Sequence, residues 1–206
     1  TLSFSFLLFS FSMNYSIFWG DTHHNTYMGY IQNPPLSEIL AFAATYLDFY
    51  TSAYYTPAGT GKPLLKKSGD PAGLSSGGHP VEKLPASSEW VGIRIEGWKD
   101  PDKMAREWKE VEAATAAWNR PGRFVAFPGY EWQGDGTWGD HNVVYKQEGH
   151  PIFKVETLRE LYQQLKTLEA IAIPHHTGYK VRDRAPDWSY CDDSISSFAE
   201  LFSVHG

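Results

Sequence analysis

The sequence predicts an α/β fold with a mainly parallel sheet, either open or closed as a barrel. Runs rich in β-branched and aromatic residues alternate with segments of helical period along the 206-residue chain, which is typical of strands joined by crossover helices. Polar motifs also follow nearly every predicted strand, and α/β barrels assemble their active sites at the carboxyl ends of strands. The histidines at or beside predicted strand ends are His23, His24, His141, His175, His176 and His205.

Length and composition indicate one globular domain, which we place at residues 13–206. The chain is 42% hydrophobic and 16% aromatic, enough for one sizeable core. Its net charge of −6 argues against a nucleic acid as the main partner. The single cysteine, Cys191, excludes an internal disulfide and a cysteine-rich zinc site.

Residues 1–12, TLSFSFLLFSFS, are strongly apolar, and we exclude them from the fold. They are too short to span a membrane, and we expect no membrane partner. Two origins stay open. If Met13 is the true start, the sequence favours a cytoplasmic protein. If residues 1–12 are the remnant of a signal peptide, the protein is secreted or periplasmic.

The first half of the chain predicts two strands and a helix before a long loop. Tyr15–Trp19 predicts a strand that ends at Gly20-Asp21, and Leu36–Leu47 has an apolar face at helical spacing. Asp48–Tyr55 is β-rich and predicts the second strand. Residues 56–89 are rich in Pro, Gly, Ser and Lys and predict a long loop insertion, typical of a lid, a binding loop or a disordered insert.

The middle of the chain predicts a helix between strands. Trp90–Trp98 predicts a short strand, and Asp100-Pro101 opens a helix over Asp102–Trp118. Phe124–Phe127 is a continuous apolar run, typical of a strand buried on both faces. We expect Pro128-Gly129 to end that strand, which leaves Glu131 just beyond it.

The last part predicts three strands and a helix. Asn142–Tyr145 predicts a strand with His141 at its mouth. Thr157 and Glu160 form a capping box before an apolar stripe of helical spacing. Ala170–Ile173 predicts a strand that ends at Pro174-His175-His176, and Phe198–Val204 predicts a last strand that ends at His205.

Histidine and glutamate together are typical ligands of Zn, Mn or Fe, and a divalent ion activates water as a nucleophile at neutral pH. GLSSG at residues 73–77 and GDGTWG at residues 134–139 match the spacings G-x-S-x-G and G-x-G-x-x-G, but neither is followed by the predicted helix that a nucleophile elbow or a dinucleotide fingerprint requires. The sequence has no phosphate-binding P-loop. Neighbouring residues of a strand point to opposite faces, so we favour His23 over His24 and His175 over His176. We expect His79 and His150 to be surface residues.

Several motifs resemble those of a known superfamily. GDTHHNT is similar to the opening motif of the polymerase and histidinol phosphatase (PHP) superfamily. FPGYEW, GDHNVVY, IPHHTGY and ELFSVHG resemble one of its branches, the domain of unknown function family 3604. The resemblance covers about Ser16 to Gly206. It implies a distorted (β/α)7 barrel that holds a di- or trinuclear metal centre and hydrolyses phosphate or carboxylic-type esters.

The resemblance also implies roles for individual residues. His23 matches the first opening histidine, and Asn25 stands where the second is usual. Glu131 matches the bridging carboxylate, and His141 and His175 match two further ligands. We therefore expect one or two ions of Zn, Mn or Fe, with Glu131 and His23 as catalytic residues. The residues expected at the metal site are His23, Asn25, Glu131, His141 and His175. Residues expected to orient ligands or contact a small-molecule substrate are Asp21, Asp140, His176, Glu200 and His205.

The sequence departs from the family pattern at three places. Asn25 replaces a histidine, Tyr54-Tyr55 replace an Asp-His pair, and the chain stops at Gly206 before a late Asp-x-His motif. We therefore expect a fragment whose barrel is incomplete at the C-terminus. Two functions stay open: a metal-dependent ester hydrolase, and a catalytically degenerate domain that binds a ligand or partner through an aromatic-rich cleft.

Overall fold

The computed structural model of the chain describes residues 16–28, 34–56, 100–134, 137–179 and 185–201. The apolar stretch 1–12, the expected strand Trp90–Trp98 and all but the first residue of the loop insertion 56–89 lie outside the described residues, as does His205.

The described residues form one sheet of five strands in the order of the sequence. The strands are β1 (Gly20–Thr26), β2 (Phe49–Tyr55), β3 (Val125–Trp132), β4 (His141–Tyr145) and β5 (Ala170–Pro174). The first three strands are parallel, and β4 is antiparallel to both neighbours. The α/β class is confirmed, but the sheet is open and mixed rather than mainly parallel, and a closed barrel is not confirmed.

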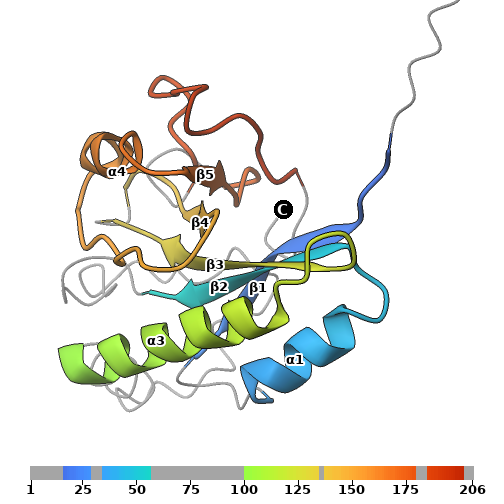
Figure 1. The fold of residues 1–206 in the computed structure, drawn as a ribbon. Helices are drawn as coiled ribbons and strands as arrows, with labels where there is room; N and C mark the ends of the chain where they lie inside the picture. Colours follow the sequence, from blue (N-terminus) through green and yellow to red (C-terminus); the bar gives the residue numbers. More distant parts are fainter. Residues whose placement is uncertain (1–15, 29–33, 57–99, 135–136, 180–184, 202–206) are drawn as a thin grey trace, which may run out of the picture.

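Three described helices accompany the sheet: α1 (Leu36–Ala43), α3 (Pro101–Trp118) and α4 (Leu158–Leu165). Figure 1 shows α1 and α3 along one side of β1–β3, with α4 beside β4 and β5. The side chain of Asp100 caps α3 by accepting hydrogen bonds from two backbone N–H groups, and the expected capping box of Thr157 and Glu160 opens α4. None of the described helices is long and apolar enough to cross a membrane.

The core between α3 and the sheet is built around aromatic rings. Trp108 of α3 packs edge-on against Tyr54 of β2, Tyr130 of β3 and Tyr145 of β4, with ring centroids 6.1–6.3 Å apart. Such edge-to-face pairs add about 0.5–1.5 kcal/mol each beyond the burial of apolar surface. One face of the sheet is therefore packed against α3. The candidate site described below lies on the opposite face.

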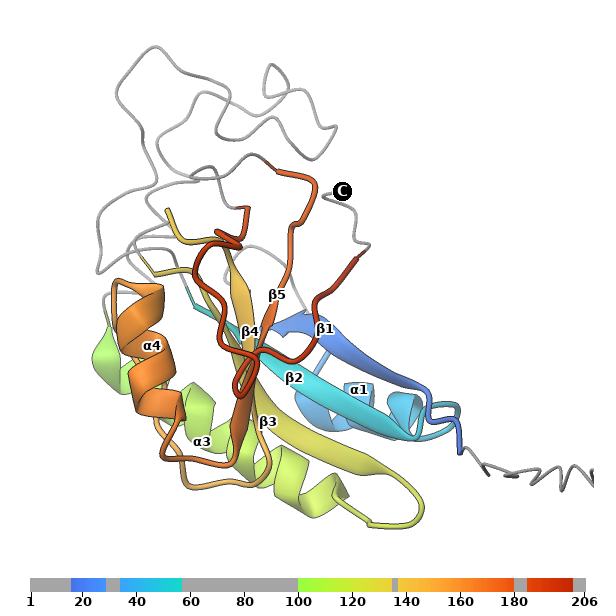
Figure 2. The ribbon, with the colours of Figure 1, turned by 90° about the horizontal axis from the view of Figure 1, so that it is seen from above.

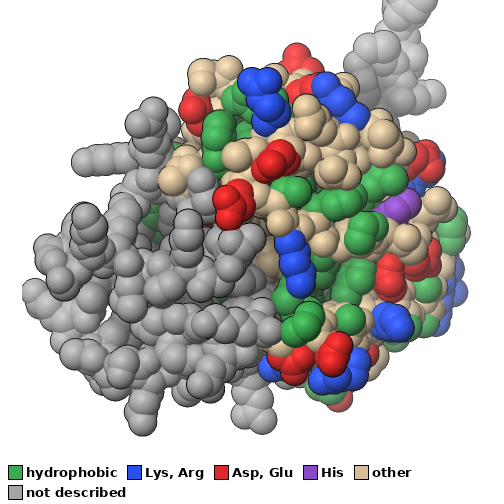
Figure 3. Space-filling view, turned by 90° about the vertical axis from the view of Figure 1, so that its left-hand side faces the viewer, with side chains coloured by type: hydrophobic (Ala, Val, Ile, Leu, Met, Phe, Trp, Pro, Cys, Tyr) green, Lys and Arg blue, Asp and Glu red, His purple; other side chains and the backbone are tan. Residues whose placement is uncertain are grey.

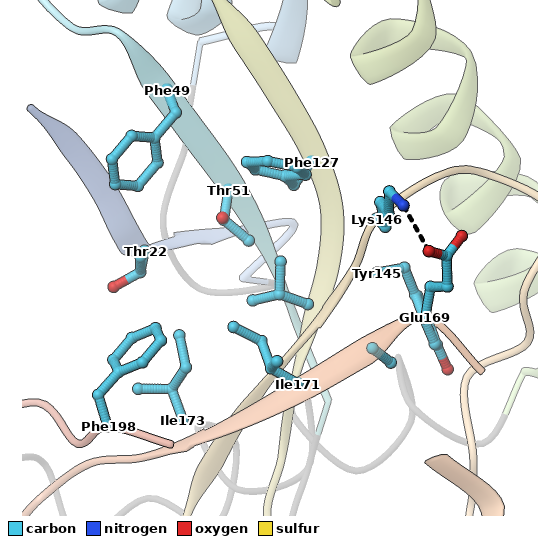
Figure 4. Close-up of a pocket in the computed structure, with 12 residues that line it drawn as sticks. Thr22, Phe49, Thr51, Phe127, Tyr145, Lys146, Glu169, Ile171, Ile173 and Phe198 are labelled. Atoms are coloured by element: carbon cyan, nitrogen blue, oxygen red, sulfur yellow. Dashed lines mark hydrogen bonds and ion pairs between the residues drawn. The ribbon is translucent and has the colours of Figure 1, made fainter. Parts of the chain in front are cut away.

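Figure 2 shows the strands of the sheet turning relative to one another from β1 to β5, and apolar side chains gather at one end of the face opposite α3. Side chains of all five strands and Phe198 line a pocket of about 360 Å³, and Figure 4 shows Phe49, Phe127, Ile171 and Ile173 pointing toward it. Since alternate residues of a strand share a face, Glu131 lies on the same face as Phe127, and His175 on the same face as Ile173. The pocket includes none of the residues expected to bind a metal.

The surface on one side of the molecule carries both charges. In Figure 3, acidic and basic side chains of the described residues are interspersed with apolar and uncharged ones. That side therefore shows no extended basic area among the residues that the structure describes.

Two predicted strands have different bounds. The expected strand Tyr15–Trp19 is wrong: Ile17, Phe18 and Trp19 are exposed, and pairing with β2 begins at Gly20. The apolar pattern failed because the polar residues that follow it are the ones that pair. β3 also continues through Pro128-Gly129 to Trp132. Proline is tolerated there because β4 pairs with β3 only from Gly129 onward.

The expected last strand, Phe198–Val204, is also different. Residues 198–201 have no regular strand, and the rest lie outside the described residues. One backbone hydrogen bond still holds this segment beside β5, since Glu200 N–H donates to the Pro174 carbonyl, and just before the segment Ala172 N–H donates to the Ile195 carbonyl. This alignment carries Glu200 toward β1.

Candidate metal centre

Four buried side chains converge where β3 and β5 end and β4 begins. Glu131, Asp140, His175 and His176 each offer one ligand atom, and these atoms all lie within 4.8 Å of one another. Glu131 comes from β3, Asp140 precedes β4, and the two histidines follow β5. The antiparallel placement of β4 brings its start to the same edge as the ends of β3 and β5, so three segments meet there.

Both histidines enter the group because the strand has ended before them. β5 stops at Pro174, and His176 has a φ of 59°. A non-glycine residue in this left-handed region costs about 1–2 kcal/mol and is enriched at functional sites. The turn places His176 Nε2 3.4 Å from Asp140 Oδ2. We favoured His175 over His176 for the case that both lie within the strand, but β5 ends before them, and both side chains belong to the group.

Glu131 is held by groups from two segments. Asn25 Nδ2 donates to Glu131 Oε2 at 2.6 Å, and Gln133 Nε2 donates to Glu131 Oε1 at 2.7 Å. His175 Nε2 lies 3.7 Å from Glu131 Oε1. Glu131 is 2% exposed, and buried carboxylates occur in proteins mainly where they are paired or bind metal.

His175 fits a metal ligand by a separate observation. Its side chain is fully buried, and among the described residues neither of its ring nitrogens has a hydrogen-bond partner. An unpaired buried polar atom costs about 1–3 kcal/mol. A neutral imidazole offers one lone pair, and a divalent ion between His175 and the nearby carboxylates would satisfy it.

His23 forms an ion pair beside this group. Its Nδ1 lies 2.7 Å from Glu200 Oε2, its ring centroid lies 4.2 Å from that of His175, and its backbone N–H donates to Asp21. Burial lowers the pKa of His23, but the hydrogen bond to Glu200 and the charges of Glu131, Glu200 and Asp21 outweigh it and raise the pKa overall. The pair is part-buried, so it connects the buried group with the surface.

His141 is buried but is not part of the four-residue group. Its ring packs against Trp132, the residue opposite it on β3, and against Tyr162 of α4. Its Nδ1 donates to the Gly139 carbonyl at 3.0 Å, which leaves the lone pair on Nε2. Burial, together with the nearby His175, lowers the pKa of His141 to about 3, against the opposing effect of the Gly139 hydrogen bond.

Stability in acid should depend on His141. The unfolded chain takes up a proton near pH 6.5, whereas the native ring stays neutral down to about pH 3. The contribution of His141 to the free energy of unfolding is therefore complete above pH 6.5 and is lost as pH falls toward 3. The free energy of unfolding changes by at most about 1.4 kcal/mol per pH unit on account of this residue. Urea unfolding of protein stripped of metal by a chelator, repeated across this pH range, measures the free energy of unfolding. That free energy should change less steeply with pH in His141→Gln than in the native chain, and an equal dependence on pH would contradict the prediction.

Three further residues near the site were not expected to bind a metal. His24 packs on Tyr50 with ring centroids 5.7 Å apart, so it points away from His23, as strand alternation predicts. Tyr54, which stands in place of an expected metal ligand, donates through its hydroxyl to Glu107. The sequence alone did not single out Gln133. It could have been found from its position two residues after Glu131, because alternation along a strand places Glu131 and Gln133 on the same face.

A family model described as "Protein of unknown function (DUF3604)" matches residues 79–178 of the chain. The matched segment includes all four residues of the buried group, and it ends before Glu200. No curated protein matches the chain.

Proposed function

We propose that the chain is a metal-dependent hydrolase of the PHP type, which cleaves a phosphate or carboxylic-type ester of a small molecule. The observation that carries the proposal is His175, a fully buried imidazole without a hydrogen-bond partner among the described residues, within reach of two carboxylates. The resemblance of the motifs to the PHP superfamily supports the same reading, and the family match covers the segment that carries the group.

Glu131, Asp140, His175 and His176 would hold a divalent ion such as Zn, Mn or Fe. Such an ion, when bound, lowers the pKa of water and stabilises negative charge on an ester oxygen. The mixture of two carboxylates and two imidazoles suits all three metals, and none of the four side chains is a cysteine that would favour zinc alone.

His23 and Glu200 supply the proton transfer in this proposal. The Nδ1–H of His23 donates to Glu200 Oε2, which fixes the tautomer and leaves Nε2 to accept or release a proton. A histidine oriented by a carboxylate is a common general acid–base arrangement. Its place beside the buried group, with part of its side chain exposed, lets it exchange protons with both substrate and solvent.

The experiment is a hydrolysis assay on metal-loaded protein. Chelated protein is reloaded with Mn²⁺, Zn²⁺ or Fe²⁺ and tested on p-nitrophenyl phosphate and p-nitrophenyl acetate, beside Glu131→Gln and His23→Ala. We expect activity with at least one metal, its loss in Glu131→Gln, and a large loss in His23→Ala that retains metal. Tight metal binding without hydrolysis of either ester would instead favour the degenerate binding domain.

A further inference from the structure

We propose that Asn25 and Gln133 form an amide clamp that fixes the carboxylate of Glu131, and that both are positioning residues rather than metal ligands. The proposal deepens the metal centre and rests on the proposed function for its consequence, which is tighter metal binding. The contact itself is a property of the metal-free chain and can be tested without any ion.

The clamp closes on Glu131 from two separate segments. Gln133 follows β3 directly, is 1% exposed, and shares the face of Glu131 by strand alternation. Asn25 lies on β1, 106 residues away along the chain from Glu131. The two donors reach different oxygens, at 2.7 Å for Gln133 and 2.6 Å for Asn25. A carboxylate held at both oxygens cannot rotate without breaking one bond.

The chemistry of the donors matters as much as their geometry. An amide NH₂ donates hydrogen bonds and has no lone pair to offer a metal, so the nitrogen atom with which Asn25 holds Glu131 cannot itself be a ligand. Both amides are also neutral. A lysine or arginine in their place would cancel the charge of the carboxylate that must attract a cation, whereas an amide orients the carboxylate and leaves its charge in place.

The clamp also explains how β1, the edge strand, is held next to the candidate metal centre. β1 pairs with β2 alone among the described strands, and its register shifts between Asp21 and His24. Asn25 follows this irregularity and bonds to β3, across the intervening β2. Holding Asn25 in place thus also holds the segment of β1 that carries His23 beside His175.

The first arm of the test uses metal-free protein. Side-chain amide signals of Asn25 and Gln133 are followed by ¹⁵N NMR in the native chain and in Glu131→Gln, which keeps the volume of Glu131 and removes its charge. We expect both NH₂ signals to shift, while that of the exposed Gln164 on α4 stays. Unchanged signals for Asn25 and Gln133 would overturn the clamp.

The second arm measures metal affinity by competition with a chelator. Gln133→Met keeps most of the side-chain volume but cannot donate, and Asn25→Leu does the same on the other oxygen. Each should weaken Mn²⁺ or Zn²⁺ binding about 10–100-fold, the usual effect of removing a partner of a ligand. Thr115→Val on α3, also a buried polar site, should leave affinity unchanged.

The outcomes separate the clamp from the proposed function. Native affinity in both Gln133→Met and Asn25→Leu would overturn the positioning role while the metal centre stands. If the native chain binds neither ion, the hydrolase proposal fails, and the NMR arm still decides whether the amides hold Glu131. A loss confined to thermal stability, with affinity unchanged, would assign both residues to packing alone and would also overturn the proposal.

Discussion

His175→Ala should abolish metal retention while the chain stays folded. Among the residues that the structure describes, His175 is one of four closely spaced ligand side chains, and its ring has no hydrogen bond there that the substitution would break. Removing an outer partner of a ligand already costs about 10–100-fold in metal affinity, so loss of the ligand itself should cost more than about 100-fold. Elemental analysis after gel filtration measures the effect, and circular dichroism checks the fold.

His24→Ala is the matched control. His24 is one residue from His23 on β1, but it packs on Tyr50 on the other side of the strand. It should retain the metal content of the native chain. If His175→Ala binds as much metal as His24→Ala, the buried imidazole is a core residue, and the metal-dependent reaction loses its main support.

The helices and most strands could be predicted because their patterns are local. The spacing of apolar residues and the caps located α3 and α4, and the second, fourth and fifth strands began within a residue of their predicted starts. β1 could not be predicted, because GDTHHNT has no apolar alternation and becomes a strand only by pairing with β2. The antiparallel direction of β4 likewise depends on pairing between segments, which local periodicity does not encode.

The candidate site was predictable in part for the same reason. Glu131 and His175 could be named because each follows a recognisable apolar run. Asp140 and His176 were expected only near the site, since their entry depends on backbone turns, one of them at a left-handed residue. His141 was expected as a ligand, yet its contacts are with Trp132 and Tyr162. Which side of a short strand faces the site is set by register, not composition.

Gly139→Ala should be among the most damaging single substitutions in the described part of the chain. Gly139 has a φ of +83°, and a Cβ there would lie 2.5 Å from Pro186 Cα and 2.8 Å from the Ala185 carbonyl carbon. The left-handed backbone costs an alanine about 1–2 kcal/mol, and forcing atoms into packed space costs about 1–3 kcal/mol more. Because Asp140 follows directly, relief of the clash should also displace a metal-ligand candidate.

Gly149→Ala separates strain from collision. Gly149 has a similar φ of +91°, but a Cβ there meets no atom within 4 Å. Gly149→Ala should lose only the free energy that the left-handed backbone costs an alanine, about 1–2 kcal/mol. It should bind metal as the native chain does. Urea unfolding and chelator competition on both variants give the comparison. Gly139→Ala should be the less stable by about 1–3 kcal/mol and the weaker in metal binding. Equal stability and equal affinity would mean that the 185–186 segment yields to the added methyl, and that the position of Asp140 does not depend on Gly139.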